Sequence, residues 1–365
     1  MVPEATPSRS RLAAHEVAAT VVAVDCNGAD LGAAEVAAGA ALAAEQGVRS
    51  LLFGPAEALG APSSRVEVVD APLSIAKSPD PAGAVRAQPE ASIVQAAKAV
   101  ADGRAQALVC AGGTGAALAA SLFNVKRAAG IYRPALALSL PVPRHPVTLL
   151  DVGANAVVRR EHMVQFAFMG AALSRAVLGV AEPRVGLLSN GEEADRGSPL
   201  VLEVHAELTQ RASTGIDGFR FVGNVEGGDL LEGAVDVAVT DGFTGNIALK
   251  LMEGVSQTML SAIREAATAN LRGKIGGALL RSALGGFRRE IDPELQGGAY
   301  LLGLRRLGVV PHGRFTRVGF AQAIVRAERG AREDIVGRTH DALQRAGALR
   351  EVPVSAPVAS LREAE

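Results

Sequence analysis

The stretch VDVAVTDGFTGNIALKLMEG, from Val235 to Gly254, predicts a buried strand, a glycine-rich turn and a helix in direct succession. The strand is expected over Val235–Thr240, and apolar side chains recur at helical spacing after Asn246. The turn between them contains small and polar residues: Asp241, Gly242, Thr244 and Gly245. Because the N–H groups of a helix's first turn point the same way, such a turn can hold an anion.

The same alternation of apolar runs and alanine-rich helical patterns continues along most of the chain. A strand over Thr20–Asp25 precedes a helix near Ala33–Gln46, and a helix over Ser92–Gly103 precedes a strand over Gln106–Gly112. This rhythm predicts an α/β fold with a mostly parallel, doubly wound sheet that helices cover on both faces.

Glycine-rich turns follow six of the predicted strands. Ligands of such sheets bind beyond the carboxyl ends of the strands, so we expect the six turns to meet at one end of the sheet. A single turn of this kind is more often ordinary turn chemistry. The turns are residues 25–30, 111–116, 151–155, 189–197, 223–229 and 241–246.

The composition excludes several classes of protein. Thirty-seven basic and 38 acidic residues leave a net charge of −1, which argues against nucleic-acid binding driven by net charge. Two cysteines, Cys26 and Cys110, exclude a disulfide framework and a cysteine-based zinc site, and we expect both to be buried fillers in a reducing cytosol. The uncharged segment Ala105–Val125 predicts a buried strand, turn and helix rather than a membrane span.

The motifs of common cofactors and nucleophiles are missing. Gly113 and Gly115 begin a dinucleotide pattern that lacks its third glycine, and neither a P-loop nor a GxSxG motif occurs. The six histidines lack metal-ligand spacing, so we expect no metal and no cofactor. Backbone N–H groups, Asn and Thr suit a substrate that brings its own nucleophile, such as phosphate attacking a thioester.

Residues 271–289 form a basic amphipathic segment. It predicts either contact with an anionic membrane surface or a partner or core helix with solvated charges. The polar ends of the chain, residues 1–18 and 349–365, are expected to be disordered around one α/β domain of residues 19–348.

Several motifs resemble the PlsX-type phosphate acyltransferases of bacterial phospholipid synthesis. The similar stretches keep the family's order from about residue 20 to about residue 345. The most specific are DVGAN (151–155), EHMVQFAFMG (161–170), GNVEG (223–227), DGFTGNIALKLMEG (241–254) and GGAYLLG (297–303).

The resemblance implies a homodimer with a fold of the isopropylmalate dehydrogenase type, related to phosphate acetyltransferases. It implies transfer of a fatty acyl group from acyl carrier protein to inorganic phosphate, giving an acyl phosphate. It also implies a cytoplasmic protein that touches the inner face of the membrane through a helical hairpin at residues 271–289.

The expected catalytic residues are Asp241, Asn246, Lys250 and His162. Asp241 would orient a donor or handle a proton with Lys250 or His162 as its partner. The turn after it would offer donors to phosphate oxygens, and Asn155 and Asn224 would polarise the thioester carbonyl. The expected substrate-binding residues are Asp25, Gly28, Arg86, Thr114, Gly115, Asn155, Asn224, Glu226, Gly242, Thr244, Gly245 and His312.

The chain departs from the family pattern at several of these turns. Ala29 and Leu31 replace a glycine and a histidine, Gly113 replaces an asparagine, and Arg314 follows His312-Gly313 where the family has serine. A pair of lysines after Arg86 is also absent. Acyl coenzyme A as donor therefore stays open, as does a catalytically impaired relative that binds acyl carrier protein or membrane.

Overall fold

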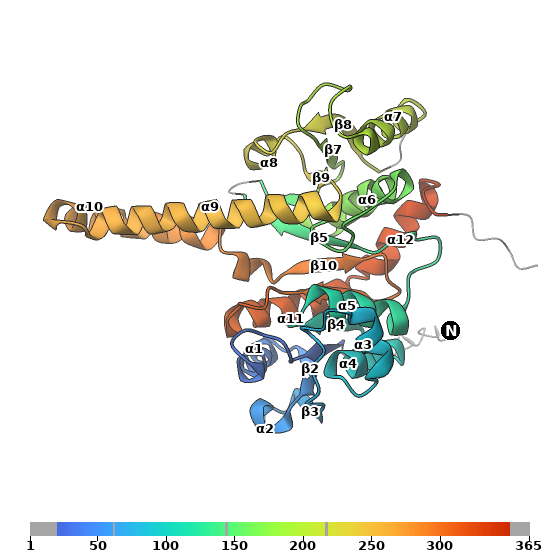
Figure 1. Cartoon of the computed structure of the whole chain (residues 1–365). Helices are drawn as coiled ribbons and strands as arrows, with labels where there is room; N and C mark the ends of the chain where they lie inside the picture. Colours follow the sequence, from blue (N-terminus) through green and yellow to red (C-terminus); the bar gives the residue numbers. More distant parts are fainter. Residues whose placement is uncertain (1–19, 61–62, 143–144, 216–217, 351–365) are drawn as a thin grey trace, which may run out of the picture.

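A computed structural model describes residues 20–60, 63–142, 145–215 and 218–350. It shows an α/β fold on one 11-stranded sheet with helices on both faces (Figure 1). The strand order is β3-β2-β1-β4-β11-β10-β5-β6-β9-β7-β8. Most neighbouring strands are parallel, which confirms the predicted fold class.

The predicted disordered ends lie outside the described residues, with one exception at the C-terminal side. Leu349 packs on the core, and the Arg350 N–H donates to the Gly130 carbonyl at 2.8 Å. The ordered domain therefore reaches at least residue 350 rather than 348.

The elements follow the predicted alternation closely. The strands are β1 (Val21–Asp25), β2 (Arg49–Gly54), β3 (Val66–Asp70), β4 (Ala107–Cys110), β5 (Ala135–Leu140), β6 (Val147–Leu150), β7 (Arg184–Leu188), β8 (Arg220–Val225), β9 (Val237–Val239), β10 (Ala299–Leu302) and β11 (Leu307–Val310). The helices are α1 (Ala33–Glu45), α2 (Ala56–Leu59), α3 (Pro81–Ala87), α4 (Ser92–Ala101), α5 (Thr114–Ala120), α6 (Arg160–Leu173), α7 (Pro199–Ser213), α8 (Asp229–Glu232), α9 (Gly242–Thr268), α10 (Leu271–Glu290), α11 (Arg317–Arg332) and α12 (Ile335–Arg345). A 3₁₀ turn, Pro293–Gln296, follows α10.

The strands are buried on both faces. Val22 and Val24 of β1 belong to the core layer beneath α1, α6 and α11, while Ala23 belongs to the layer beneath α4 and α5. Such burial explains why the strands read as continuous apolar runs rather than alternating ones. Cys26 and Cys110 are both buried, as predicted.

The direction of the strands reverses across the middle of the sheet. Strand β10 is antiparallel to β11 and to β5, and β5 is antiparallel to β6. Three consecutive reversals leave β1 to β4, β5 and β11 running one way and β6 to β10 the other. The prediction that six turns share one end of the sheet is therefore wrong. The turns after β1 and β4 lie at one end of the strands, and those after β6, β7, β8 and β9 lie at the opposite end.

Helices α9 and α10 form a hairpin that projects from the body of the domain (Figure 1). The 27 residues of α9 extend for about 40 Å at ~1.5 Å per residue. Among the helices of the described residues, none has both the length and the apolar content to cross a membrane.

Candidate active site

The start of α9 is locked against the loop that follows β6. A Cβ atom on Gly245 would lie 2.0 Å from the Asp151 carbonyl oxygen, and one on Gly242 would lie 2.7 Å from the Asn155 carbonyl oxygen. The Gly242 N–H donates to that same Asn155 oxygen at 2.8 Å. The two glycines thus permit a backbone-to-backbone approach that sets the direction of α9.

The loop itself is organised by the carboxylate of Asp151, which has no exposed surface. Its Oδ1 accepts from the N–H groups of Leu136, Gly153 and Ala154 at 2.9–3.1 Å. Its Oδ2 accepts from the Asn155 N–H and Nδ2, both at 2.8 Å. Burial raises the pKa of Asp151 even against these five bonds, so the carboxylate is a structural hub, which was not among the predicted residues.

The N–H groups of the 241–246 turn are already occupied. Asp241 caps α9 by accepting from Phe243 N–H and Thr244 N–H at 2.9 Å and from the Thr244 hydroxyl at 2.7 Å. The Gly245 N–H donates to the Asp241 carbonyl. The expectation that this turn offers donors to phosphate is not met, because an N-cap carboxylate satisfies them first. Asp241 also bonds its own helix rather than Lys250 or His162.

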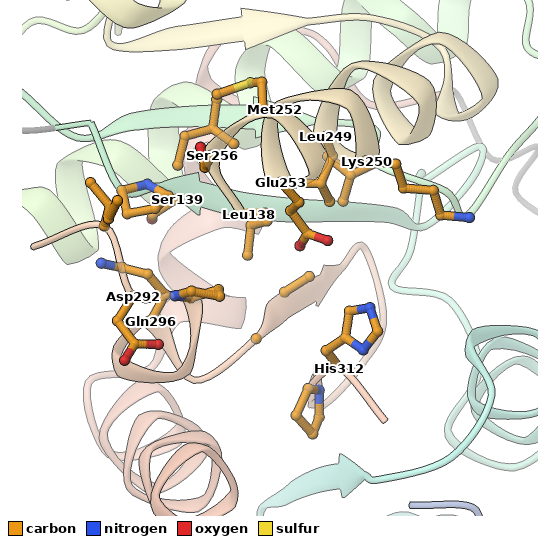
Figure 2. Close-up of a pocket in the computed structure, with 18 of the residues that line it drawn as sticks. Leu138, Ser139, Leu249, Lys250, Met252, Glu253, Ser256, Asp292, Gln296 and His312 are labelled. Carbon is orange, nitrogen blue, oxygen red and sulfur yellow. The ribbon is translucent and has the colours of Figure 1, made fainter. Parts of the chain in front are cut away.

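One cleft lies beside this junction, between α9 and the face of the central strands (Figure 2). Its volume is about 630 Å³. Asn246, Lys250 and Glu253 face it from successive turns of α9, spaced four and three residues apart as one helix face requires. The Asn246 amide also donates to the Val152 carbonyl at 3.0 Å, which fixes the side chain at the mouth of the cleft.

The opposite wall comes from the end of β11 and the start of α5. His312, Arg314 and Thr114 line it. Arg314 forms an ion pair with Glu253 at 2.9 Å across the cleft. Desolvation, followed by the charges of Arg314 and Lys250, lowers the pKa of His312, so its ring is neutral at neutral pH. The Arg314 N–H donates to His312 Nδ1 at 3.3 Å, which leaves the ring proton on Nε2.

Most of the remaining lining is apolar, although it also includes Ser139, Ser256, Gln257, Asp292 and Gln296. Leu136, Leu138 and Leu140 from β5 form its floor, and Leu249 and Met252 of α9 form its roof. In Figure 2, Leu138 lies between the Lys250 and His312 side and the Asp292 and Gln296 side. The arrangement joins a polar, cation-containing end to an apolar groove.

The structure brings four predicted residues together in the cleft: Thr114, Asn246, Lys250 and His312. The cleft runs along the length of β5, so one turn from each end of the strands reaches it: Thr114 follows β4 and Asn246 follows β9. The turns at 189–197 and 223–229 do not line it.

The two asparagines expected to polarise a carbonyl are engaged elsewhere. Asn155 Nδ2 donates to Asp151 and to the Pro134 carbonyl at 2.7 Å. Asn224 Nδ2 donates to the carbonyls of Glu193 and Arg196, and it thereby ties the turn after β7 to the turn after β8.

The remaining predicted residues also lie outside the cleft lining. His162 belongs to α6, beneath the other face of the sheet, where its Nδ1 accepts from the Arg159 N–H at 3.1 Å. The Arg86 guanidinium stacks on the Phe123 ring with 4.6 Å to its centroid. Four further predicted residues do not line the cleft: Asp25, Gly28, Gly115 and Glu226.

Asp25 and Gly28 pack the turn after β1 against the turn after β4. Asp25 is buried and accepts from the Ser92 hydroxyl at 2.6 Å. Gly28, at φ +100°, lies so close to Gly112 that a Cβ atom would be 2.8 Å from the Gly112 Cα. These contacts explain the motif residues as packing requirements.

Three charged residues of the cleft were not among the predicted site residues: Glu253, Asp292 and Arg314. Glu253 follows Lys250 by three residues, so helical periodicity could have placed it on the same face. Arg314 was seen as a departure from the family pattern, but its pairing with Glu253 joins segments 61 residues apart and leaves no local signal. Within the described ranges, no group of three or more His, Cys, Asp or Glu side chains is arranged to hold a metal ion.

Comparison with known proteins places the chain among acyl-transferring enzymes. Residues 20–338 match the family model described as "Fatty acid synthesis protein". The phosphate acyltransferase of Pelotomaculum thermopropionicum is 42% identical over 324 residues, which cover 87% of this chain and 92% of that protein. The phosphate acyltransferase of Gloeobacter violaceus is 42% identical over 332 residues, covering 88% and 95%.

Solved structures with the same fold are more distant in sequence. The EutD phosphotransacetylase of Staphylococcus aureus has a TM-score of 0.55 at 17% identity, covering 86% of this chain and 94% of its own. A branched-chain phosphotransacylase of Enterococcus faecalis has a TM-score of 0.56 at 15% identity, covering 86% and 99%.

The α9 junction predicts opposite effects for two glycines of one helix. We expect Gly245→Ala to lower the free energy of unfolding by about 2 kcal/mol or more, because the methyl group meets the Asp151 backbone. Gly254→Ala meets open space and should raise stability by up to ~1 kcal/mol. Urea unfolding of both variants measures the difference, and equal effects would contradict the close approach.

Asp25 predicts a pH-dependent stability. Burial raises its pKa to about 6 from 3.8, so its carboxyl is protonated in the folded chain at pH 5 and stability falls as pH rises through 6. The cost at neutral pH is about 3 kcal/mol. The stability gain of Asp25→Asn over the natural chain should therefore grow between pH 4 and pH 6–7. The exposed Asp102→Asn is the control, and a pH-independent difference for Asp25→Asn would refute the assignment.

Proposed function

The chain belongs to the fatty acid synthesis protein family, whose members include the phosphate acyltransferases, and it is an acyltransferase; from this we propose that it transfers a fatty acyl group from acyl carrier protein to inorganic phosphate and releases an acyl phosphate. The observation that carries the proposal is the cleft under α9. Its polar end holds Asn246, Lys250 and His312, and its apolar groove continues from there along β5.

The groups at the polar end fit the two substrates. Lys250 supplies positive charge for a phosphate dianion, and the Nε2–H of neutral His312 can donate to an oxygen without adding charge. The free N–H of the Asn246 amide is a donor for the thioester oxygen, where negative charge develops during attack. Glu253 holds Arg314 beside this site.

The reaction needs no covalent enzyme intermediate. An oxygen of hydrogen phosphate forms a bond to the thioester carbon, and the tetrahedral intermediate collapses as the carbon–sulfur bond breaks. The proton of hydrogen phosphate ends on the leaving thiol, so charge and atoms balance. Positioning and charge neutralisation are the contributions that the cleft can make.

We expect the purified chain, incubated with palmitoyl-acyl carrier protein and inorganic phosphate, to give an acyl phosphate that hydroxylamine traps as a hydroxamate. Lys250→Met and Asn246→Ala should each lower kcat/KM by on the order of a hundredfold, the usual loss when a charge-stabilising group is removed. Lys98→Met, at an exposed position of helix α4 and outside the cleft, is the matched control and should keep full activity.

The result also separates the alternatives. A hydroxamate formed only with palmitoyl-coenzyme A would change the donor but keep the site. A folded chain that makes none with either donor would overturn the proposed reaction and leave a relative that binds acyl carrier protein or membrane.

We propose further that the chain is a cytoplasmic homodimer that touches the inner face of the membrane. Two separate apolar surfaces of the hairpin support this. Helix α9 carries an exposed ridge at every fourth residue, with exposures of 42–65%, that a second copy would cover: Phe243, Ile247, Leu251, Val255, Met259 and Ile263. Helix α10 exposes Leu271, Ile275 and Leu279 beside Arg272 and Lys274, as a segment on an anionic bilayer would.

One variant tests each surface. Leu251→Glu should halve the mass measured by light scattering, because it buries a charge in the dimer contact. Leu279→Glu should leave the mass unchanged but reduce co-sedimentation with phosphatidylglycerol vesicles several-fold. Circular dichroism checks the fold of both, and a dimer that survives Leu251→Glu would rule out the α9 ridge as its contact.

A further inference from the structure

The cleft is elongated along α9, where its lining includes the polar Ser256 and Gln257 as well as apolar side chains. The residues of α9 that line it run from Asn246 through Met252 to Leu260. At ~1.5 Å per residue this path is about 21 Å long. A groove of this length is far larger than an acetyl group needs.

The two ends of the groove differ in chemistry. One end carries Lys250 and His312, and Figure 2 places Asp292 and Gln296 on the other side of Leu138 from them. Leu260 and Ile291, both half-buried, line the groove together with Pro293 on that far side. An occupant that fills the cleft would therefore place an anionic or hydrogen-bond-accepting head at Lys250 and His312 and a largely apolar body along Leu138 and Met252.

We propose that Leu260 and Ile291, on the far side of the groove, set the longest acyl chain that the site accepts. This inference rests on the proposed function, since it assigns the acyl part of the same substrate. The thioester carbon lies near Asn246 and Lys250, and the chain passes between Leu138 and Met252 before it reaches the two far residues.

The physical basis is the burial of methylene groups. Each buried methylene improves binding by about fourfold, as long as the groove extends beyond it. A side chain that fills the far end removes this gain for long chains and leaves it intact for short ones. The two residues therefore act on the ratio between substrates rather than on the chemical step.

The experiment compares palmitoyl- and octanoyl-acyl carrier protein as donors. For Leu260→Trp and Ile291→Trp we expect the palmitoyl-to-octanoyl ratio of kcat/KM to fall at least about tenfold, with the octanoyl value little changed. Leu202→Trp on helix α7, outside the cleft, is the control and should keep the natural ratio.

A binding measurement separates this inference from the proposed reaction. The fluorescent long-chain acid cis-parinaric acid should bind the natural chain and the Leu202→Trp variant, and it should bind the two cleft variants at least about tenfold more weakly. Acyl phosphate formation with an unchanged chain-length ratio and unchanged probe binding would overturn the inference while the proposed function stands. If the natural chain forms no acyl phosphate but the two cleft variants still bind the probe more weakly than it does, the result supports the groove and not the reaction.

Discussion

The buried carboxylate of Asp151 is the interaction on which the rest of the site depends. It gathers N–H groups from β5 and from the loop after β6, so the loop presents its backbone to α9 in one fixed shape. Gly242 and Gly245 then let α9 start directly against that backbone. This junction aims the face of α9 that carries Asn246 and Lys250 over the central strands. A buried carboxylate with five donors is costly to rearrange, which makes it a suitable anchor.

The motif that looks like an anion-binding turn is therefore an anchor for a helix, and the polar residues of α9 that line the cleft, Asn246 and Lys250, lie one and two turns further along. Asp241 occupies the donors that phosphate would need, whereas Lys250 faces the cleft and lies among the charged groups that shift the pKa of His312. The lysines that the family pattern has and this chain lacks belong to another part of the chain, the stretch after Arg86. Arg314, held by Glu253, adds a positive charge to the cleft that the pattern itself does not contain.

The sequence predicts the strands and helices well because buried parallel strands and alanine-rich helices have distinct periods, as β1 and α4 illustrate. It could not predict the reversal at β10, since the choice of strand partner depends on contacts between distant segments such as Tyr300 and Ala137. The same limit affects the site. Lys250 and His312 were identified from local motifs, but the role expected for Asn155 took no account of the Pro134 carbonyl, a partner that only the folded chain brings to it.

The account's central claim is that the acyl phosphate forms in the cleft under α9, with its phosphate at Lys250 and His312. A crystal structure with a palmitoyl phosphonate, a stable analogue of the product, tests this most directly. We predict density for the phosphonate between Lys250 and His312 and for the chain along Leu138 toward Leu260. A phosphonate bound instead at the turn after β1, or on the N–H groups of Gly242 to Gly245, would contradict the account.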